Sequence, residues 1–311
     1  SKFEISPEES STCYTSTNNT NCNITGLNIM SKPNVKSYRD ASVATYGANI
    51  MAMNDEGNIY GLSTDNDTHM IKNMEWGAVA YLSHSKYGVN REVYINNSSS
   101  RYTGRSGGNV GGSTPINGTY TDQTSTTQYN SYGFYTYDGY LLEYGTNTKS
   151  TTKDISKVSS TTGNIYGVYD MSGGATEHTM GNIVSPDGTT MMSGNSTSFN
   201  SGYTGIIYDG GKYTSYTGEY NYPEEKYYDK YSFETSNSQR IRSKLGDGIK
   251  EVLNTSSRGW YSDDSNLARS NDPWFVRGGI FNIGSYAGAF YSSANNGNAG
   301  ANFSSRLIIT P

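Results

Sequence analysis

The sequence predicts an α+β fold that is rich in loops, and three observations carry this prediction. Hydrophobic residues make up only 33% of the 311 residues and charged residues 16%, with 36 glycines, so small polar residues must fill long loops. The 29 tyrosines and three tryptophans supply the apolar mass that disordered chains lack. Helix-like patterns then lie in residues 38–88, whereas strand-like patterns lie toward the end of the chain.

Two helices are expected between residues 38 and 88. The first runs from Tyr38 through about Asn54, with a capping start at Asp40-Ala-Ser-Val. The second begins at the cap Asp67-Thr68. Its buried face is expected to carry a stripe of apolar residues at the spacing i, i+3, i+7 and i+11, which consists of Ile71, Met74, Ala78 and Leu82. A third stretch, residues 236–253, is expected to be helical in part.

Strands are expected in three places. Residues 132–142 alternate aromatic and small side chains around the turn signal Asp138-Gly139, which predicts a hairpin. Phe275-Val276 and Leu307-Ile308-Ile309 have the composition of buried strands. Residues 1–35 are polar and are expected to form an extended segment with one short strand.

The interval between the last two strands is unusual in composition. Between Arg277 and Arg306 there is no Lys, Arg, Asp or Glu, and Gly, Ala, Ser and Asn are mixed with Ile and aromatic residues. This interval is too polar and glycine-rich for a core, yet too aromatic for a plain linker. Aromatic anchors among small polar residues are typical of a binding surface.

Three motif blocks resemble one branch of the C-type-lectin fold, the formylglycine-generating-enzyme-like (sulfatase-modifying factor) branch. They are residues 74–88, residues 163–181 and residues 274–309, the last with Arg277-Gly278-Gly279 and a closing Arg306-Leu-Ile-Ile. The resemblance implies two helices packed on small twisted antiparallel sheets. It implies a single domain over residues 36–311, preceded by residues 1–35. It also implies structural roles for Arg277, Arg306 and the acidic residue Glu177.

Within this branch, the likeness is to the variable proteins of diversity-generating retroelements. In those proteins, mutagenesis at adenines of Asn-type codons varies a ligand-binding face. Residues 274–311 would be the variable region here. The interval between Arg277 and Arg306 contains several asparagines but no Lys, Glu, Gln, Met or Trp. Residues between two buried strands would emerge on one face. The contact residues implied are Ile280, Phe281, Asn282, Ile283, Tyr286, Ser293, Ala294, Asn295, Asn296, Ala301, Asn302 and Phe303.

The resemblance implies a ligand-binding protein displayed on a bacterial or phage surface, with a surface protein or glycan of another cell as partner. Two alternatives stay open: a structural subunit of a pilus, tail fibre or surface layer, and a carbohydrate-binding lectin of fixed specificity. The formal net charge of −5 and the lack of any basic block argue against nucleic-acid binding. No apolar run approaches the roughly 18 residues of a membrane helix. Because the chain begins at Ser1-Lys2 without a methionine, upstream residues are expected to have been removed or left out, and a signal peptide, an anchor or an assembly segment could have stood there.

Cys13 and Cys22 are the only cysteines and lie in a short polar segment. They predict a disulfide and an oxidising compartment, with two unpaired thiols as the alternative. Acidic residues such as Asp209, Asp263 and Asp264 could hold Ca²⁺. However, no EF-hand spacing is present, so we expect no metal and no other cofactor.

No enzyme activity is expected. The enzymes of this branch use cysteine chemistry near the C-terminus, and no cysteine follows Cys22. The three histidines, His69, His84 and His178, belong to no recognisable catalytic motif. Glu177 and His178 are adjacent on an expected strand, so their side chains should point to opposite faces and not act together.

Three positions depart from the pattern of the branch by having small residues where large rings are usual. They are Thr176, Ser292 and Ser305. An uncompensated loss of this kind costs about 3–5 kcal/mol at each site. We therefore expect either neighbours that fill the space or a reduced melting temperature.

Overall fold

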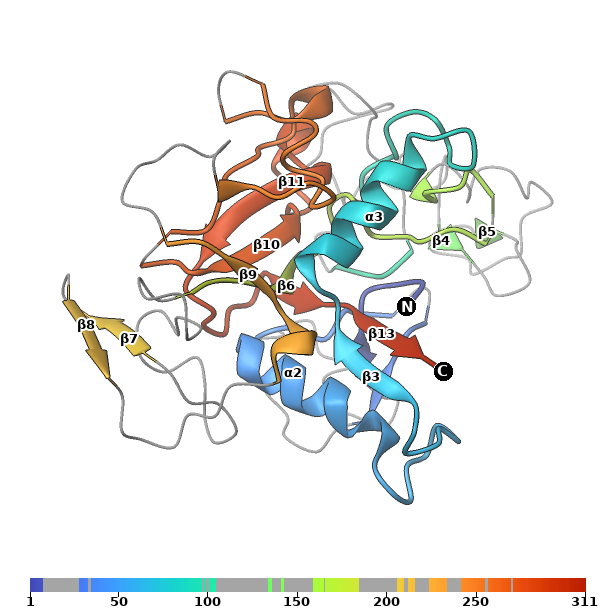
Figure 1. Ribbon diagram of the computed structural model, residues 1–311. Helices are drawn as coiled ribbons and strands as arrows, with labels where there is room; N and C mark the ends of the chain where they lie inside the picture. The colour runs from blue at the N-terminus through green and yellow to red at the C-terminus, as the bar shows by residue number, and fades with distance from the viewer. Residues whose placement is uncertain are drawn as a thin grey trace.

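A computed structural model describes residues 1–7, 28–32, 35–96, 98, 101–104, 134–135, 141–142, 159–164, 166–184, 206–209, 212–215, 224–233, 242–254, 257–269 and 271–311. Within them the chain is α+β, with two α-helices, several small sheets and long irregular connections (Figure 1). The prediction of a loop-rich α+β fold is confirmed at this level.

The largest sheet has five strands and contains most of the C-terminal region. β6 (Thr176–Ile183) lies at its centre, between β10 (Trp274–Gly278) and β12 (Phe303–Ser305), and it also pairs with β9 (Asp229–Tyr231). β11 (Gly288–Asn295) pairs with the other side of β10. The pairs β6–β10 and β10–β11 are antiparallel, whereas β12 and β9 run parallel to β6. All eight residues of β6 are buried.

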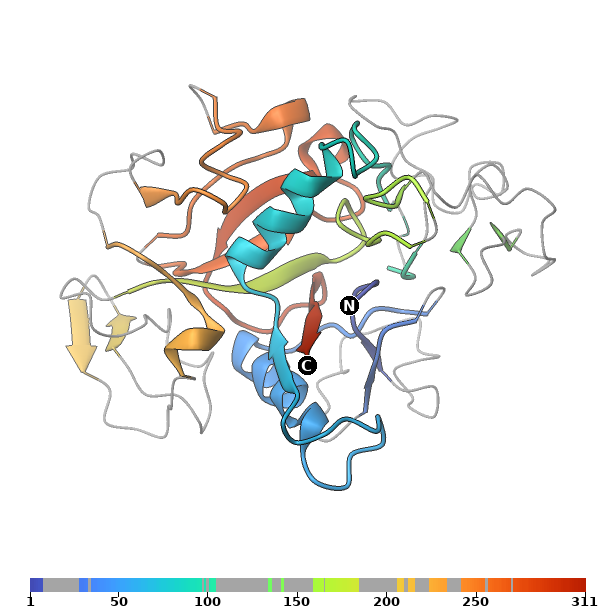
Figure 2. The same ribbon diagram turned by 45° about the vertical axis from the view of Figure 1, so that its right-hand side comes forward.

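The two helices cover opposite faces of this sheet. α2 (Val43–Met51) and α3 (Asn73–Ser83) lie on either side of β6 in two views of the molecule (Figures 1 and 2). Because side chains alternate along a strand, neighbouring residues of β6 reach different helices. Thr179 donates a hydrogen bond to Asn73 of α3, whereas Met180 packs in the hydrophobic cluster around α2. Both faces of β6 are therefore core.

The first helix forms where it is expected, but it begins later. Asp40 has a positive φ of 64°, which interrupts a helix before it starts. Ser42 is the N-cap, and its hydroxyl accepts from the amide of Thr45 at 3.2 Å. After Met51 the chain tightens into the 3₁₀ turn η1 (Ala52–Asn54), so the expected end near Asn54 is confirmed.

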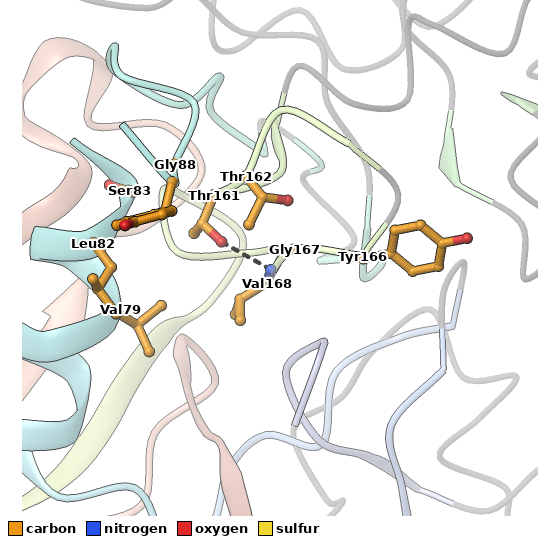
Figure 3. Close-up of a pocket in the computed structure, with 10 residues that line it drawn as sticks. Val79, Leu82, Ser83, Gly88, Thr161, Thr162, Tyr166, Gly167 and Val168 are labelled. Carbon is orange, nitrogen blue, oxygen red and sulfur yellow. Dashed lines mark hydrogen bonds between the residues drawn. The ribbon is translucent and has the colours of Figure 1, made fainter. Parts of the chain in front are cut away.

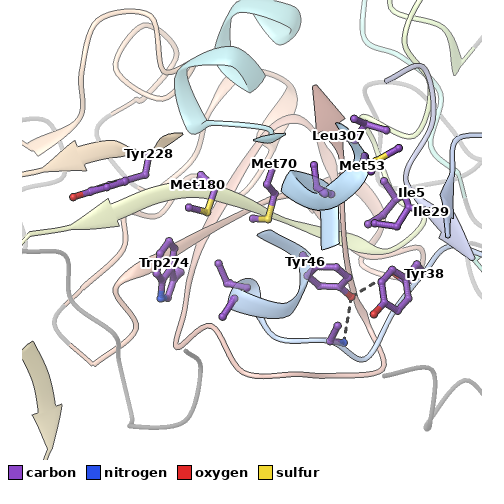
Figure 4. Packing of buried hydrophobic residues seen from close by; sticks show 14 residues of the cluster. Ile5, Ile29, Tyr38, Tyr46, Met53, Met70, Met180, Tyr228, Trp274 and Leu307 are labelled. Carbon is purple, nitrogen blue, oxygen red and sulfur yellow. Dashed lines mark hydrogen bonds between the residues drawn. The ribbon is translucent and has the colours of Figure 1, made fainter. Parts of the chain in front are cut away.

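The cluster around α2 joins the first and last parts of the chain. Ile5, Ile29, Tyr46, Met180 and Trp274 pack together in it (Figure 4). The Tyr46 hydroxyl donates to the carbonyl of Phe303 at 2.8 Å, so the polar end of a fully buried ring has a partner. Helix α2 is thus fixed directly to β12.

The expected start of the second helix is wrong. Residues Asp67–Met70 form the strand β3, which pairs antiparallel with β13 (Leu307–Thr310). Helix α3 begins at Asn73, where the Glu75 carboxylate accepts from the amide of Lys72 at 2.8 Å. A partner strand more than 230 residues away in the sequence (Met70 pairs with Leu307) outcompetes the local capping signal.

The expected buried face of this helix is also wrong. The buried residues of α3 are Asn73, Trp76, Gly77, Ala80 and Ser83, whereas Ala78 is exposed and Leu82 is 57% exposed. The helix packs closely against the backbone of residues 246–247, since a Cβ on Gly77 would lie 2.3 Å from the carbonyl oxygen of Gly246. Small residues are needed at this contact, so the apolar periodicity does not mark it.

Four pairs of short strands, with two to four residues in each strand, complete the described sheets. β1 (Ser6–Pro7) pairs with β2 (Ile29–Met30), and β4 (Phe134–Tyr135) pairs with β5 (Leu141–Leu142). β7 (Ile206–Asp209) pairs with β8 (Lys212–Ser215), and β3 with β13. The hairpin expected over residues 132–142 is confirmed in its strands. Within residues 1–7 and 28–32, the described part of the N-terminal segment, there are two short strands where one was expected.

The third stretch was expected to be helical in part, and its residues 236–241 lie outside the described residues. Arg242 is helical, whereas residues 245–252 form turns and bends, in which Leu245 is 77% exposed and Ile249 is fully buried. Short 3₁₀ turns follow elsewhere, at η3 (Glu225–Tyr227), η4 (Trp260–Ser262) and η5 (Gly284–Tyr286). Among the helices of the described residues, none has the length and apolar character needed to cross a membrane.

Candidate ligand-binding surface

A buried ion pair anchors the C-terminal strands to β6. Arg306, between β12 and β13, donates to both carboxylate oxygens of Glu177 and to the carbonyl of Tyr169 at 2.9 Å. The side chains of Arg306 and Glu177 are 1% and 0% exposed. Burial raises the pKa of Glu177 to about 7, although Arg306 acts in the opposite direction. The structural role expected of both residues is confirmed.

Arg277 performs a similar task one strand away. Its guanidinium donates to Asn73 at the start of α3 and to the carbonyl of Asp247, both at 3.0 Å. Burial lowers the pKa of Arg277 to about 10, so the side chain stays charged at neutral pH. Arg277 therefore holds together β10, the start of α3 and the loop on which that helix rests, as the sequence predicts for a structural arginine.

The twelve residues predicted to contact a ligand share one property, which is that none of them is buried. Parts of the segments between them are buried: Ala287–Phe290 is buried throughout, as are Ser292, Gly297 and residues 304–307, whereas Gly284, Tyr291 and residues 298–300 are not. Buried and accessible positions therefore alternate along residues 279–307. The predicted residues are all accessible, but they are not the whole of the accessible set; they are Ile280, Phe281, Asn282, Ile283, Tyr286, Ser293, Ala294, Asn295, Asn296, Ala301, Asn302 and Phe303.

One group of these residues gathers around Arg101. The Arg101 guanidinium lies 4.4 Å from the ring centroid of Phe281 and donates to the side-chain oxygen of Asn302. The amide of Phe281 donates to Gly174, and the carbonyl of Asn302 accepts from Thr176 at 2.9 Å. Sequence reasoning missed Arg101, because it lies in a low-complexity stretch with no motif.

A second group lies at the end of β11. Ser293 and Ala294 pair with Val276 and Phe275, and Asn295 pairs with Trp274. The Asn295 side chain accepts from the amide of Gly297 at 2.7 Å, and that of Asn296 accepts from Asn298 at 3.1 Å. These two asparagines therefore also stabilise the turn that leaves the strand.

Tyr286 forms a third group with a neighbouring turn. The Arg258 guanidinium lies 3.9 Å from its ring centroid, and its carbonyl accepts from the amide of Asp264. In the turn η4, which lies between Arg258 and Asp264 in the chain, Trp260 is 41% exposed and Tyr261 is 38% exposed. Tyr261 and Ser262 have φ values of 60° and 73°, which is a strained conformation for residues with side chains.

The twelve residues lie at two ends of β10 and do not form one compact cluster. In the β10–β11 register, Asn295 lies beside Trp274 and Gly288 beside Gly278. Residues 280–286 follow Gly278, so they lie beyond one end of β10, while Asn295 and Asn296 lie at the other. Four residues of strand separate the two ends by roughly 13 Å. Phe303 pairs with Thr176, which places it at the Gly278 end.

The three small residues at positions usually filled by rings have compensating neighbours. Thr176 is 5% exposed and lies beside Phe303, whose ring is 4.8 Å from that of His178. Ser292 donates to the carbonyl of Asn266 at 2.7 Å, and Ser305 donates to that of His178 at 3.2 Å. The ring of Phe303 thus lies beside Thr176, and the two serine hydroxyls bond to backbone carbonyls.

The three histidines occupy three separate environments. His69 lies between the carboxylates of Asp67 and Glu75, at 3.1 Å from each. His84 packs against Trp260 and Phe290, and its Nδ1 lies 2.9 Å from the Tyr261 hydroxyl. Burial lowers the pKa of His84 to about 4.

His178 is fully buried among rings on the α2 side of the sheet. Burial lowers its pKa to about 3, so the imidazole is neutral at ordinary pH. Glu177, its neighbour in the chain, bonds to Arg306 on the other side, as expected for adjacent strand residues.

Two of the three aspartates considered for Ca²⁺ have other roles. Asp263 is fully buried and accepts from the amide of Phe290 at 3.0 Å, while Asp264 pairs with Arg258. Asp209 lies in β7, away from both in the sheet arrangement. In the described parts of the chain, no three His, Cys, Asp or Glu side chains are placed to hold a metal ion. Cys13 and Cys22 lie outside the described residues.

No protein-family model and no curated protein matches this chain.

Proposed function

We propose that this chain is a non-enzymatic ligand-binding protein of the C-type-lectin fold, in the formylglycine-generating-enzyme-like branch. Its variable region is residues 274–311, diversified by a retroelement and displayed on a bacterial or phage surface. Its partner is a surface protein or glycan of another cell.

The observation that carries this proposal is the alternation of buried and accessible positions in residues 279–307. A diversified segment must vary its contact residues without disturbing the fold. Here every implied contact position is accessible, while Ala287–Phe290, Ser292 and residues 304–307 are buried and Arg277 and Arg306 bond to fixed parts of the chain. Substitutions at accessible sites away from special features usually change stability by less than about 0.5 kcal/mol.

The absence of charge supports the same proposal. The interval between Arg277 and Arg306 has Asn, Ser and Tyr but no Lys, Arg, Asp or Glu. Aromatic and aliphatic members such as Phe281 and Tyr286 would anchor the ligand, and Asn302 would provide adaptable hydrogen bonds. The two ends of the sheet would then engage two separate parts of one large ligand.

The test is made on the gene. We expect the adjacent DNA to contain a near-copy of the codons for residues 274–311, beside a reverse-transcriptase gene. Its mismatches should lie at adenines and fall on codons for the accessible residues. Mismatches concentrated on buried residues such as Ser292 or Arg306 would contradict the proposal. Absence of any copy would leave a binding domain of fixed specificity or a structural subunit.

A further inference from the structure

Helix α3 ends beside a pocket that no part of the proposed function uses. The pocket has a volume of about 320 Å³, at the lower end of the range of small-molecule sites. Figure 3 shows Val79 and Leu82 of α3 on one side and Val168 on the other. None of the twelve C-terminal residues lines it. Its lining consists of Val79, Leu82, Ser83, Tyr87, Gly88, Thr161, Thr162, Tyr166, Gly167 and Val168.

The lining is mainly apolar, although it includes three serine and threonine hydroxyl groups besides those of Tyr87 and Tyr166. Ser83 donates to the carbonyl of Ala80 at 2.6 Å, and Thr162 donates to Asn164 at 2.8 Å. The Thr161 hydroxyl accepts from the amide of Val168 at 2.9 Å (Figure 3). Each of these three serine and threonine hydroxyls therefore has a partner within the protein, and none of the ten lining residues carries a charge.

Backbone hydrogen bonds hold the walls of the pocket in place. The amide of Val89 donates to Thr161 at 2.8 Å, and that of Asn90 donates to Ser83 at 2.8 Å. The amide of Thr161 donates to the carbonyl of Val168 at 3.0 Å. The loop that contains residues 87–90 and the loop that contains residues 161–168 are thus hydrogen-bonded to each other, and the first is also bonded to the end of α3. A ligand would therefore find the pocket already formed.

Three large side chains at the edge of the pocket are exposed, and a lysine lies next to one of them. Leu82, Tyr87 and Tyr166 are 57%, 73% and 83% exposed, which is unusual for three large side chains around one hollow. The exposed ammonium group of Lys86 lies 4.9 Å from the ring centroid of Tyr87. A cation beside an apolar hollow complements a molecule with an apolar tail and an anionic head.

We propose that this pocket binds a small amphipathic carboxylate, with its aliphatic tail between Val79 and Val168 and its carboxylate near Lys86. The tail gains free energy by leaving water. The head keeps its hydration and meets the ammonium group at the rim. This site is independent of the C-terminal contact residues.

Titration with a series of straight-chain carboxylates tests the tail. Binding is followed by the NMR signals of the Val79 and Val168 methyl groups, which report on the pocket itself. Each buried CH₂ strengthens binding about fourfold, so octanoate should bind roughly 15-fold more tightly than hexanoate. Acetate should cause no shift. Equal affinities for hexanoate and octanoate, or no shift of these methyl signals at millimolar octanoate, would overturn the proposal.

Octylammonium tests the head, because it has a tail of the same length and the opposite charge. It should bind more weakly than octanoate. Lys86→Gln should weaken octanoate binding roughly twofold to fivefold, as expected for an exposed charge pair, and leave octylammonium no weaker. Equal binding of the two probes, unchanged by this substitution, would rule out the assignment of an anionic ligand.

Two matched controls exist in the chain. Lys226 lies 4.6 Å from the ring of Tyr227, its neighbour, in the same arrangement as Lys86 and Tyr87 but away from the pocket. Leu245 is exposed like Leu82 and is not part of the lining. Lys226→Gln and Leu245→Gln should leave octanoate binding unchanged, whereas Lys86→Gln and Leu82→Gln should weaken it. If both members of a pair behave alike, the pocket is not the site.

Discussion

Replacing Arg306 by methionine should reveal how much the fold depends on one buried ion pair. Methionine has a similar length but no charge, so Glu177 would lose the donor of both its bonds from Arg306. The carbonyl of Tyr169 would lose its bond from the same guanidinium. Two further carboxyl groups, Glu4 and Asp170, are buried nearby, and burial raises the pKa of each. The charges of Asp170 and Glu177 raise the pKa of Glu4 further, whereas Arg306 lowers it. Arg306 therefore lies within a cluster of buried carboxyl groups.

The expected loss follows from breaking a buried pair at one partner only. Such changes cost about 3–5 kcal/mol, which for a chain of this size lowers the melting temperature by roughly 5–8 °C. Urea unfolding at pH 8, followed by circular dichroism, measures the free energy of unfolding. Arg269 provides the control, because it pairs with Asp272 while its side chain is 69% exposed. Arg269→Met should cost less than about 1 kcal/mol.

The double variant Glu177→Gln/Arg306→Met separates the ion pair from simple loss of packing. Since both charges are gone, it should be more stable than Arg306→Met alone. The reasoning would be refuted if Arg306→Met cost less than 1 kcal/mol. It would equally be refuted if the double variant were less stable than Arg306→Met, because the two side chains would then contribute independently.

Three further changes test other contacts. Burial lowers the pKa of His178 to about 3, so the native state resists protonation that the unfolded chain accepts near pH 6.5. Stability from this group is present above that pH and is lost on acidification. His178→Phe removes this loss. The free energy of unfolding of the variant should therefore rise, relative to that of the unmodified chain, by about 1.4 kcal/mol for each unit that the pH falls from 6 to 4, and a difference that does not change with pH would contradict this. Thr176→Trp should destabilise the fold by about 1–3 kcal/mol in thermal melts, because Phe303 and His178 already fill the space beside Thr176; a gain in stability would show that a void exists there. Gly288→Ala should lower the melting temperature, since its Cβ would lie 1.9 Å from the carboxylate of Asp263, and Asp263→Ala in the same chain should relieve part of that clash.

The acidic cluster gives a pH dependence of the opposite sign. Burial raises the pKa of Glu177 to about 7, so the native state binds this proton more tightly than the unfolded chain does. Stability from this group is therefore present below pH 4.5 and is lost as pH rises toward 7. Glu177→Gln should remove that part of the pH dependence, as measured by unfolding between pH 5 and 8. An unchanged slope would count against it.

Local patterns predicted those features whose causes are local. The helix near residues 43–54 was predictable from its cap and composition, and so was the burial of β10 from its apolar residues. The start of α3 was not, because the pairing of Asp67–Met70 with β13 depends on a distant strand. The buried face of α3 could not be predicted from the spacing of apolar residues, because Gly77 packs against the backbone of Gly246. That contact leaves no room for a side chain.

The candidate surface divides in the same way. That residues such as Phe281 and Asn302 are accessible could be predicted from a polar, uncharged interval between two strands. Their distribution over two ends of a sheet could not, because it follows from the β10–β11 register and its irregularity after Arg277. Arg101 was invisible in the sequence, since only the tertiary fold places it beside Phe281.

The pairing of the sheets has a consequence for synthesis on the ribosome. The strands that pair with β6, namely β9, β10 and β12, are all synthesised after it. Strand β3 can pair only after β13 has been synthesised, more than 230 residues later (Met70 with Leu307). Even the amide of Ile5 donates to the carbonyl of Ser305. Translation proceeds at roughly 5–20 residues per second, so the N-terminal strands spend ten seconds or more without their native partners. Because the chain also carries little charge, a nascent chain of this kind depends on its small number of aliphatic residues to stay unaggregated until its last strands emerge.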